Sequence, residues 1–229
     1  TDDPCGTGAV QLNFGQGPLC VDQYEISPSE SCPVTELTNV TQTQQNLNDR
    51  SCQGVSTAEQ LPWTFVTQIQ AAQICARSGK RLPTANEWFK VAATLEQSEE
   101  CVLRGQSPQR TGSAACVTSA AVYDVVGNVW EWIDESVTEG EVRGRLVPND
   151  SGYVAQVDTA GVVLATAGSP GPEYGADYAI VDGTRPGVYG MIRGGFYGSG
   201  SDGGIFAQNL AVPLDIKTNG IGFRCVKSL

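Results

Sequence analysis

Hydrophobic residues recur with a helical period in one part of the chain, residues 63–95. Gly79 interrupts this region, so the pattern predicts two helices with a short connection. The second helix should begin at Thr84, because Thr84 and Glu87 form a T-x-x-E capping box, and should run to about Leu95. The apolar stripe of the first helix consists of Val66, Ile69, Ala72, Cys75 and Ala76.

The rest of the chain carries the signals of short strands and turns. Residues 8–26 alternate around the turn sequence GQGP and predict a hairpin, whereas residues 27–62 are polar and predict a long loop. From residue 101 onward, short apolar runs are broken by Gly, Pro, Asn and Asp. Residues 136–190 should hold a hairpin or two.

These patterns predict an α+β fold in which two helices pack on short antiparallel sheets, with many loops. The chain has 229 residues, of which 40% are hydrophobic, and this length is enough for one core. We therefore expect a single domain over residues 1–229, with insertions at about 27–62 and 136–190.

Charge and composition remove several classes of function. The net charge of −11 disfavours nucleic acid and anionic membranes as partners and favours cations. The chain has no histidine, so it lacks the usual general base at neutral pH and the commonest ligand of zinc and iron.

Eight cysteines indicate disulfides, because none of them has the CxxC spacing of zinc or redox sites. Disulfides imply an oxidising compartment, so we expect a protein that is secreted or displayed at the cell surface, in an extracellular or periplasmic location. No apolar run is long enough for insertion into a membrane. A bridge between Cys32 and Cys52 would close the long polar loop.

The stretch VYDVVGNVWEWID, residues 122–134, places an acid between two tryptophans. In an extended segment Val129 and Glu131 face one side, while Trp130 and Trp132 face the other. Carboxylates of Asp124 and Glu131, together with the carbonyl groups of Gly127 and Val129, would supply four oxygen ligands for calcium.

The alternative is a tight turn into a core strand, with Glu131 paired to an arginine. The candidates for that arginine are Arg81, Arg193 and Arg224. These arginines, together with Asp22 and Glu25, are polar positions within apolar motifs, and we expect them to form ion pairs.

Four motifs, GKRLPTANEW, VYDVVGNVWEW, IRGGFYG and GIGFRCV, occur in this order. Together they resemble the formylglycine-generating enzyme family, also called the sulfatase-modifying factor domain. The resemblance implies an irregular variant of the C-type lectin fold, and it places the calcium ligands of the family on Asp124, Gly127, Val129 and Glu131.

The resemblance also implies a disulfide from Cys75 on the first helix to Cys225 in the terminal GFRC segment. Proximity along the chain then suggests Cys5 with Cys20, Cys32 with Cys52, and Cys101 with Cys116. Eight cysteines allow 105 connectivities, so these local pairs are predictions.

The catalytic metals of the resembled enzymes have no matching ligands here. The family oxidises a substrate cysteine at a copper site with two cysteines, and those positions fall at or near Ser199 and Gly204. A related branch of sulfoxide synthases holds iron through histidines. We therefore expect no catalytic residues, although a divergent oxidase stays an alternative.

Without catalysis, the use of such a fold is display of loops on a rigid frame. The loop 196–220 occupies the family's active-site region and mixes aromatic and short polar residues, as recognition loops do. Its candidate binding residues are Phe196, Tyr197, Ser199, Ser201, Asp202, Phe206, Gln208 and Asn209. A glycine-rich loop whose aromatic residues lie in the core is the competing interpretation.

The expected partner is a protein or carbohydrate ligand, or further copies of the same chain. Lectin-fold domains of this kind serve as variable receptors, with their variable segment before GFR. The long polar insertions also favour a structural subunit of an extracellular filament or surface layer, because loops of that length are uncommon in compact monomers.

Overall fold

The structure is a computed structural model that describes residues 3–15, 17–96, 101–112 and 115–229. The described residues contain three α-helices: α1 (Val40–Asn48), α2 (Gln68–Arg77) and α3 (Ala85–Ala92). The sequence predicted two, so α1 is a correction: it lies inside the stretch 27–62 that was expected to be a loop. The 3₁₀ turn η1 (Gly200–Asp202) lies shortly after the IRGGF motif at residues 192–196.

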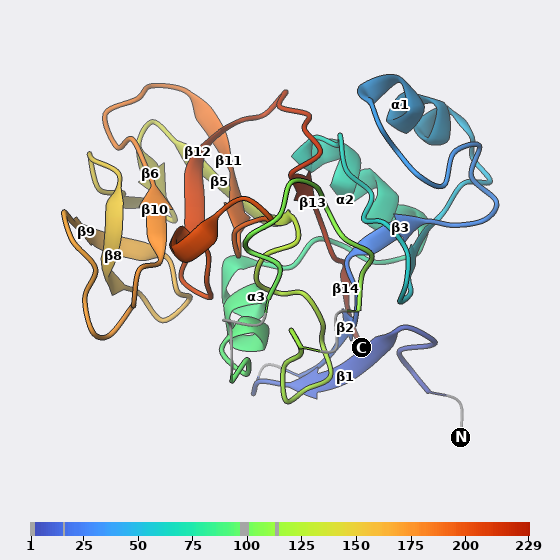
Figure 1. The fold of residues 1–229 in the computed structure, drawn as a ribbon, viewed down its shortest axis with the longest axis horizontal. Helices are drawn as coiled ribbons and strands as arrows, with labels where there is room; N and C mark the ends of the chain where they lie inside the picture. The colour runs from blue at the N-terminus through green and yellow to red at the C-terminus, as the bar shows by residue number, and fades with distance from the viewer. Residues whose placement is uncertain (1–2, 16, 97–100, 113–114) are drawn as a thin grey trace.

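The strands form three sheets within the described residues. The largest has nine strands, whereas the sequence predicted only short sheets. Its order is β7-β6-β5-β11-β12-β10-β8-β9, with β13 also paired to β5. A three-stranded sheet has the order β1-β2-β14, and β3 pairs with β4. Figure 1 shows β8, β9 and β10 at one end of the molecule and α1 at the other. The strands are β1 (Ala9–Asn13), β2 (Pro18–Asp22), β3 (Ile26–Pro28), β4 (Gly54–Ser56), β5 (Trp130–Thr138), β6 (Glu141–Val142), β7 (Arg145–Leu146), β8 (Gly152–Val157), β9 (Val163–Ala167), β10 (Tyr178–Ile180), β11 (Val188–Arg193), β12 (Gln208–Pro213), β13 (Ile221–Gly222) and β14 (Val226–Ser228).

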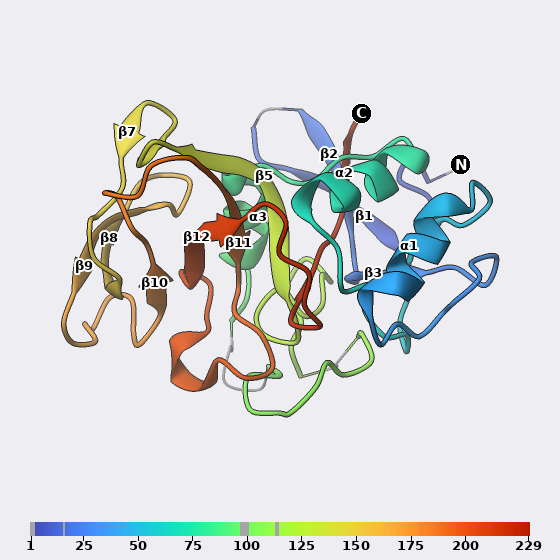
Figure 2. The same cartoon turned by 90° about the horizontal axis from the view of Figure 1, so that it is seen from above.

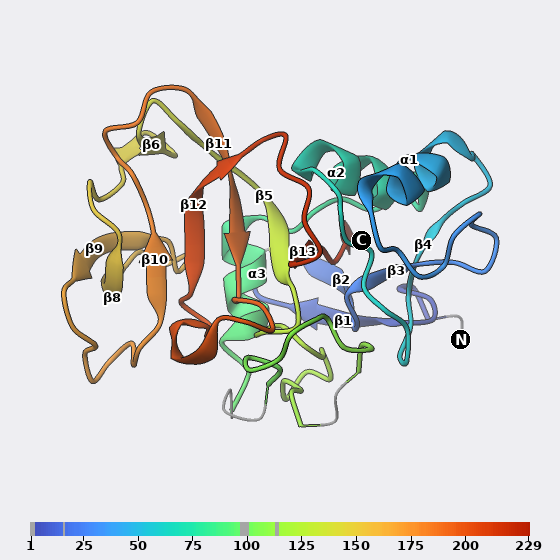
Figure 3. The same cartoon turned by 45° about the horizontal axis from the view of Figure 1, so that its top comes forward.

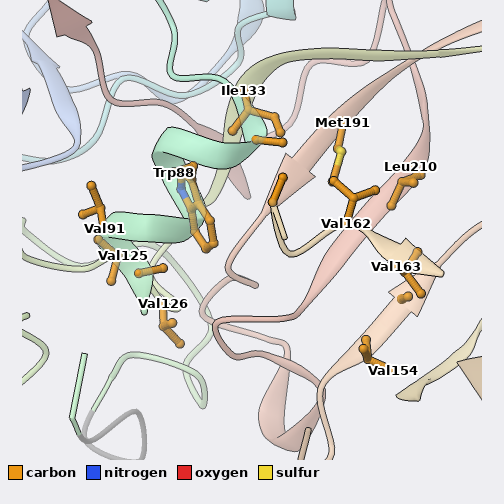
Figure 4. Packing of buried hydrophobic residues seen from close by; sticks show 14 of the residues in the cluster. Trp88, Val91, Val125, Val126, Ile133, Val154, Val162, Val163, Met191 and Leu210 are labelled. Atoms are coloured by element: carbon orange, nitrogen blue, oxygen red, sulfur yellow. The ribbon is translucent and has the colours of Figure 1, made fainter. Parts of the chain in front are cut away.

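Alternation along β5 and β11 divides the interior into two hydrophobic clusters. Trp132 and Ile192 point into a cluster that includes residues of α2, whereas their neighbours Ile133 and Met191 point into a cluster that includes residues of α3. Figure 4 shows Trp88 of α3, Ile133 and Met191 in the second cluster. The two helices therefore cover opposite faces of the same strand pair, and α3 lies against β5 and β11 (Figure 3).

Both of these helices begin with a capping box. The predicted box of Thr84 and Glu87 is confirmed, and Thr67 forms a second one with Gln70. The helix α3 ends at Ala92, three residues before the predicted end. The predicted stripe is partly confirmed, because Val66 and Cys75 are buried, but Ile69 is 61% exposed and Ala71 and Ile74 are buried in addition.

Mainly polar contacts hold α1 in place, although Leu47 packs against the cluster that includes residues of α2. Its side chains Thr43 and Asn46 are buried and bond to main-chain groups of neighbouring segments. At its C-terminal end, the Arg77 guanidinium donates to the carbonyl groups of Asn46, Leu47, Asp49 and Cys52. A helix with so few apolar residues gave no hydrophobic period, which is why the sequence predicted a loop.

The two ends of the nine-stranded sheet come together. Arg145 on β7, one edge strand, donates to the carbonyl oxygen of Val163 on β9, the other edge strand, over 3.3 Å. Its second nitrogen bonds to Asp158 over 2.9 Å. The sheet therefore curls, as the view from above in Figure 2 shows, and a side chain bridges the remaining gap.

Four disulfides join the eight cysteines in the predicted pairs: Cys5–Cys20, Cys32–Cys52, Cys75–Cys225 and Cys101–Cys116. The bond between Cys75 and Cys225 closes 150 residues and joins α2 to the terminal segment. The bond between Cys32 and Cys52 closes the insertion that contains α1. Within the described parts of the chain, no helix has the length and apolar character to cross a bilayer.

Replacing Arg77 by Met should loosen α1, because the variant leaves up to four carbonyl groups without their donor. Charge-assisted hydrogen bonds contribute about 1.5–3 kcal/mol each when shielded, and half-exposure at Arg77 places the expected loss near the lower end. Hydrogen exchange of residues 40–48 should accelerate, with a fall in the free energy of unfolding of about 1–2 kcal/mol. Arg50→Met, at an exposed arginine nearby, should change neither quantity. Equal exchange in the two variants would contradict the role of Arg77.

Candidate functional site

Glu131 lies at the centre of a buried ion pair. Its side chain faces α3 while Trp132 faces α2, as the alternation predicted. The Arg224 guanidinium donates to both carboxylate oxygens, with distances of 2.5–2.9 Å, and the indole nitrogen of Trp88 donates to Oε2 over 2.7 Å. Both Glu131 and Arg224 are 1% exposed.

The predicted calcium turn is tightly built. The Oδ2 atom of Asp124 accepts a hydrogen bond from the amide of Gly112 over 2.6 Å. Gly127 has a φ of +76°, and a Cβ there would lie 2.4 Å from the carbonyl oxygen of Val102, so only glycine fits. The amide of Val129 donates to Glu25.

This arrangement supports the arginine alternative for Glu131. A carboxylate has about four acceptor positions, and the Glu131 carboxylate accepts four hydrogen bonds from Arg224 and Trp88. The residues that the structure describes contain no group of three or more acidic or cysteine side chains arranged to hold a metal ion. Glu131 in this arrangement does not fit a calcium ligand, and calcium at the turn stays a prediction that requires Glu131 to leave Arg224.

The other expected ion pairs are partly present. Asp22 pairs with Lys80, and Arg81 pairs with Glu87 over 2.6 Å. Glu25 instead bonds to Asn128 and Val129, and burial followed by the nearby acids Asp124 and Glu131 raises the pKa of its carboxyl well above the usual value. Arg193 is fully buried, with its guanidinium 4.8 Å from the Trp88 ring, and desolvation lowers its pKa to about 9.

The loop 196–220 divides into inward and outward residues. Tyr197 is 9% exposed, and its hydroxyl donates to Asn219 over 3.1 Å. Phe196 is half-buried with its ring 4.9 Å from that of Tyr197, and the Ser199 hydroxyl accepts from the Phe196 amide. Ser201 and Asp202 are exposed on η1. The outward part of the predicted binding set is therefore concentrated at η1.

The remaining predicted binding residues have structural contacts. Gln208 is fully buried, and its amide bonds to Gly161, Val163 and Phe206. The ring of Phe206 packs against Phe89 and Tyr174. The half-buried Asn209 accepts from the amide of Ala211 within β12. For Gln208 and Phe206, the structure favours the competing interpretation in which these side chains belong to the core.

A cleft of about 610 Å³ opens beside η1. Three segments line it: residues 101–104, residues 175–177 and the turn that holds Gly200, Ser201 and Gly203. Asp177 is its acidic residue and Arg104 its basic one. The Oδ2 atom of Asp177 accepts from the amide of Phe206 over 2.7 Å. Burial raises the pKa of the Asp177 carboxyl to about 6, although that hydrogen bond and the charge of Arg193 oppose the shift.

A second cleft, of about 280 Å³, lies between the 27–62 insertion and the end of the loop. Its lining includes Leu37, Phe65, Pro108 and Asn219. Asn219 accepts a hydrogen bond from the Tyr197 hydroxyl, which joins the two ends of the loop 196–220.

Sequence reasoning missed Asp177 and Arg104. Asp177 stands in the turn-rich stretch PGPEYGADY, where an acid is typical of a solvated turn. No sequence signal places it beside the segment after η1, because its hydrogen bond with the Phe206 amide spans 29 positions and depends on the pairing of β10 with β12. Only the sheet order brings them together.

Comparisons with known structures define the fold class. The chain matches the Major Tropism Determinant P3c variant with 17% identity and a TM-score of 0.50, covering 97% of this chain and 55% of that protein. It matches CarF with 15% identity and a TM-score of 0.52, covering 95% and 88%. These neighbours have C-type-lectin-like folds, and the present structure is of that class. The chain spans about half the length of the tropism determinant.

The family model described as "sulfatase-modifying factor enzyme 1-like domain" matches residues 12–229. The chain belongs to this family, as its four motifs predicted. A comparison with curated protein sequences gave no match.

Replacing Glu131 by Gln should destabilise the fold strongly, because Arg224 would keep its charge in the interior without a counter-ion. Breaking a buried pair in this way costs about 3–5 kcal/mol. Denaturant unfolding should show this loss, while Glu36→Gln, in the exposed pair with Arg110, should cost less than about 1 kcal/mol. Similar midpoints for the two variants would contradict the central role of the pair.

Replacing Asp177 by Asn should raise stability at neutral pH. The folded-state pKa of about 6 exceeds the ordinary 3.8, so Asp177 favours folding below pH 3.8 and loses that contribution as pH rises to 6. Above pH 6 the ionised carboxylate therefore costs stability, by roughly 1–3 kcal/mol. Thermal melting should find Asp177→Asn more stable than the wild type at pH 7.5, with the difference shrinking toward pH 4. A constant difference would contradict the assignment.

Proposed function

We propose that this protein is an exported, non-catalytic binding domain that holds its ligand on the loop 196–220 and the cleft beside η1. One observation carries the proposal: an open cleft lies beside η1, within the loop where the resemblance puts the family's copper cysteines at or near Ser199 and Gly204. Serine and glycine cannot supply the thiolates that hold Cu(I).

The frame supports a binding role. A C-type-lectin-like fold with four disulfides suits the rigid display of loops, and each bridge reduces the freedom of the unfolded chain. The disulfides are also consistent with a secreted or periplasmic protein. A tropism determinant with this fold is named for its part in tropism, which favours a macromolecular partner, protein or carbohydrate.

Self-assembly is the second candidate, since the insertion that contains α1 projects at one end of the molecule (Figure 1). Light scattering of the purified protein separates the two functions. A monomer at high concentration favours ligand display, and ordered polymers favour a structural subunit.

The binding proposal is tested by filling the cleft. Ser201→Trp, on exposed η1, should abolish binding to arrayed glycans or extracellular proteins that the wild type recognises, while Thr35→Trp, at an exposed position in the insertion, should not. Recognition that survives Ser201→Trp would place the binding surface elsewhere. Formation of an aldehyde on a cysteine peptide with added copper would instead establish the divergent oxidase.

Calcium should stabilise the fold if the turn at Asp124, Gly127, Val129 and Glu131 binds it, because a ligand of the native state raises the midpoint by mass action. Melting in 1 mM calcium and in chelator should differ in the wild type and coincide in Asp124→Ala. Identical midpoints in the wild type would show that the Glu131–Arg224 pair braces this turn without an ion.

A further inference from the structure

The Asp177 side chain, from another part of the chain, packs directly against Gly204. A Cβ at position 204 would lie 2.0 Å from Oδ1 and 2.3 Å from Oδ2 of Asp177, closer than atoms in real structures approach. The backbone of Gly204 does not have a positive φ, so its conformation does not require glycine. The Asp177 carboxylate therefore takes up the space that a side chain at position 204 would occupy.

A carboxylate beside position 204 gives this place a different chemistry from that of a cysteine thiolate. The family's second copper cysteine falls at or near Gly204, and the chain brings a carboxylate there from residues 136–190, the stretch expected to be an insertion. A thiolate suits a soft metal, whereas a lone carboxylate suits a hydrogen-bond donor with positive charge.

From these contacts we propose that the cleft binds an organic cation, an ammonium or guanidinium group, with Asp177 as its acceptor. The inference rests on the proposed binding function and names the ligand chemistry of the same cleft. A lysine or arginine side chain of a partner and a free amine share this chemistry.

The cleft has the shape and walls for such a group. Its volume of about 610 Å³ is far more than one metal ion needs and lies within the range of small-molecule sites. Val102 and Leu103 supply an apolar wall along which an aliphatic stem can lie. Oδ2 of Asp177 accepts from the Phe206 amide, and no salt bridge to Asp177 is present among the described residues.

The charges around the cleft favour a cation over an anion. Arg104 also lines the cleft, but it is exposed, so water screens its charge. Asp177 is largely shielded from water, so its carboxylate has lost hydration. A hydrogen-bond donor that reaches the carboxylate compensates for this loss. The net charge of −11 adds a general attraction for cations.

The proton competes with the ligand for Asp177. Arg193 lies close enough to lower the Asp177 pKa, and Arg104 lines the cleft. The nearby acids are Asp202 on η1 and Glu173 in the loop that holds Asp177. Because the carboxyl titrates near pH 6, its ionised fraction falls about tenfold between pH 7.5 and pH 5. Binding of a cation should weaken by the same factor.

The experiment uses N-acetyl-lysine methylamide and N-acetyl-arginine methylamide as probes, with N-acetyl-norleucine methylamide as the neutral match and N-acetyl-glutamate methylamide as the anion. Titration of the isotope-labelled wild-type protein with at least one cationic probe should shift the amide signals of residues 201–206. The norleucine and glutamate probes should leave these signals unchanged. Asp177→Asn should weaken that binding at least tenfold, whereas Asp150→Asn, an exposed acid outside the cleft, should not.

Gly204→Ala tests the geometry separately, because its Cβ must push the Asp177 carboxylate aside while the charge is unchanged. We expect weaker cation binding at an unchanged fold, checked by the spectrum of residues outside the cleft. Equal binding of the cations by wild type and Asp177→Asn, or preference for the glutamate probe, would overturn the inference. If the cations fail while Ser201→Trp still abolishes recognition of a macromolecule, the binding function stands and the ligand chemistry is wrong.

Discussion

The buried pair of Glu131 and Arg224 is the interaction on which the rest of the structure depends. Arg224, next to the disulfide at Cys225, reaches the carbonyl groups of Asp22, Gln23 and Tyr123 as well as Glu131. One guanidinium thus joins the terminal segment, the end of β2, the turn before β5 and β5 itself. Charges this deeply buried persist only when each donor and acceptor has a partner, and here Trp88 supplies the last one.

The same pair changes the meaning of the calcium motif. A carboxylate bound by a guanidinium is already neutralised, so calcium at this turn would have to compete with Arg224 for Glu131. The backbone of the turn is nevertheless fixed, because Gly127 approaches Val102 closely and Asn128 bonds to Glu25 and to the backbone at Gln109. Polar contacts within the chain thus contribute to the order of the turn.

The cleft beside η1 differs from this pair, because its shielded acid is not neutralised by a neighbouring basic group in the described part of the chain. The Asp177 carboxyl is shielded without a counter-ion in contact, which costs stability at neutral pH, in contrast to the satisfied pair at Glu131. Buried ionisable groups that cost stability in this way are characteristic of binding and catalytic sites. Within the loop 196–220, Tyr197 and Gln208 are buried and support the fold, whereas η1 is exposed beside the proposed binding cleft.

The sequence by itself indicated the family, the cysteine pairs, the capping box that begins α3 and the division of Glu131 from its flanking tryptophans, because each depends on residues near one another or on a shared motif. It did not predict α1, whose buried face is polar, or the curled nine-stranded sheet, whose order joins strands far apart in the chain. The partner of Glu131 was left open among three arginines, and Asp177 was not considered at all. Tertiary structure decided these points because they depend on which distant segments meet in space, and neither hydrophobic period nor local spacing encodes that.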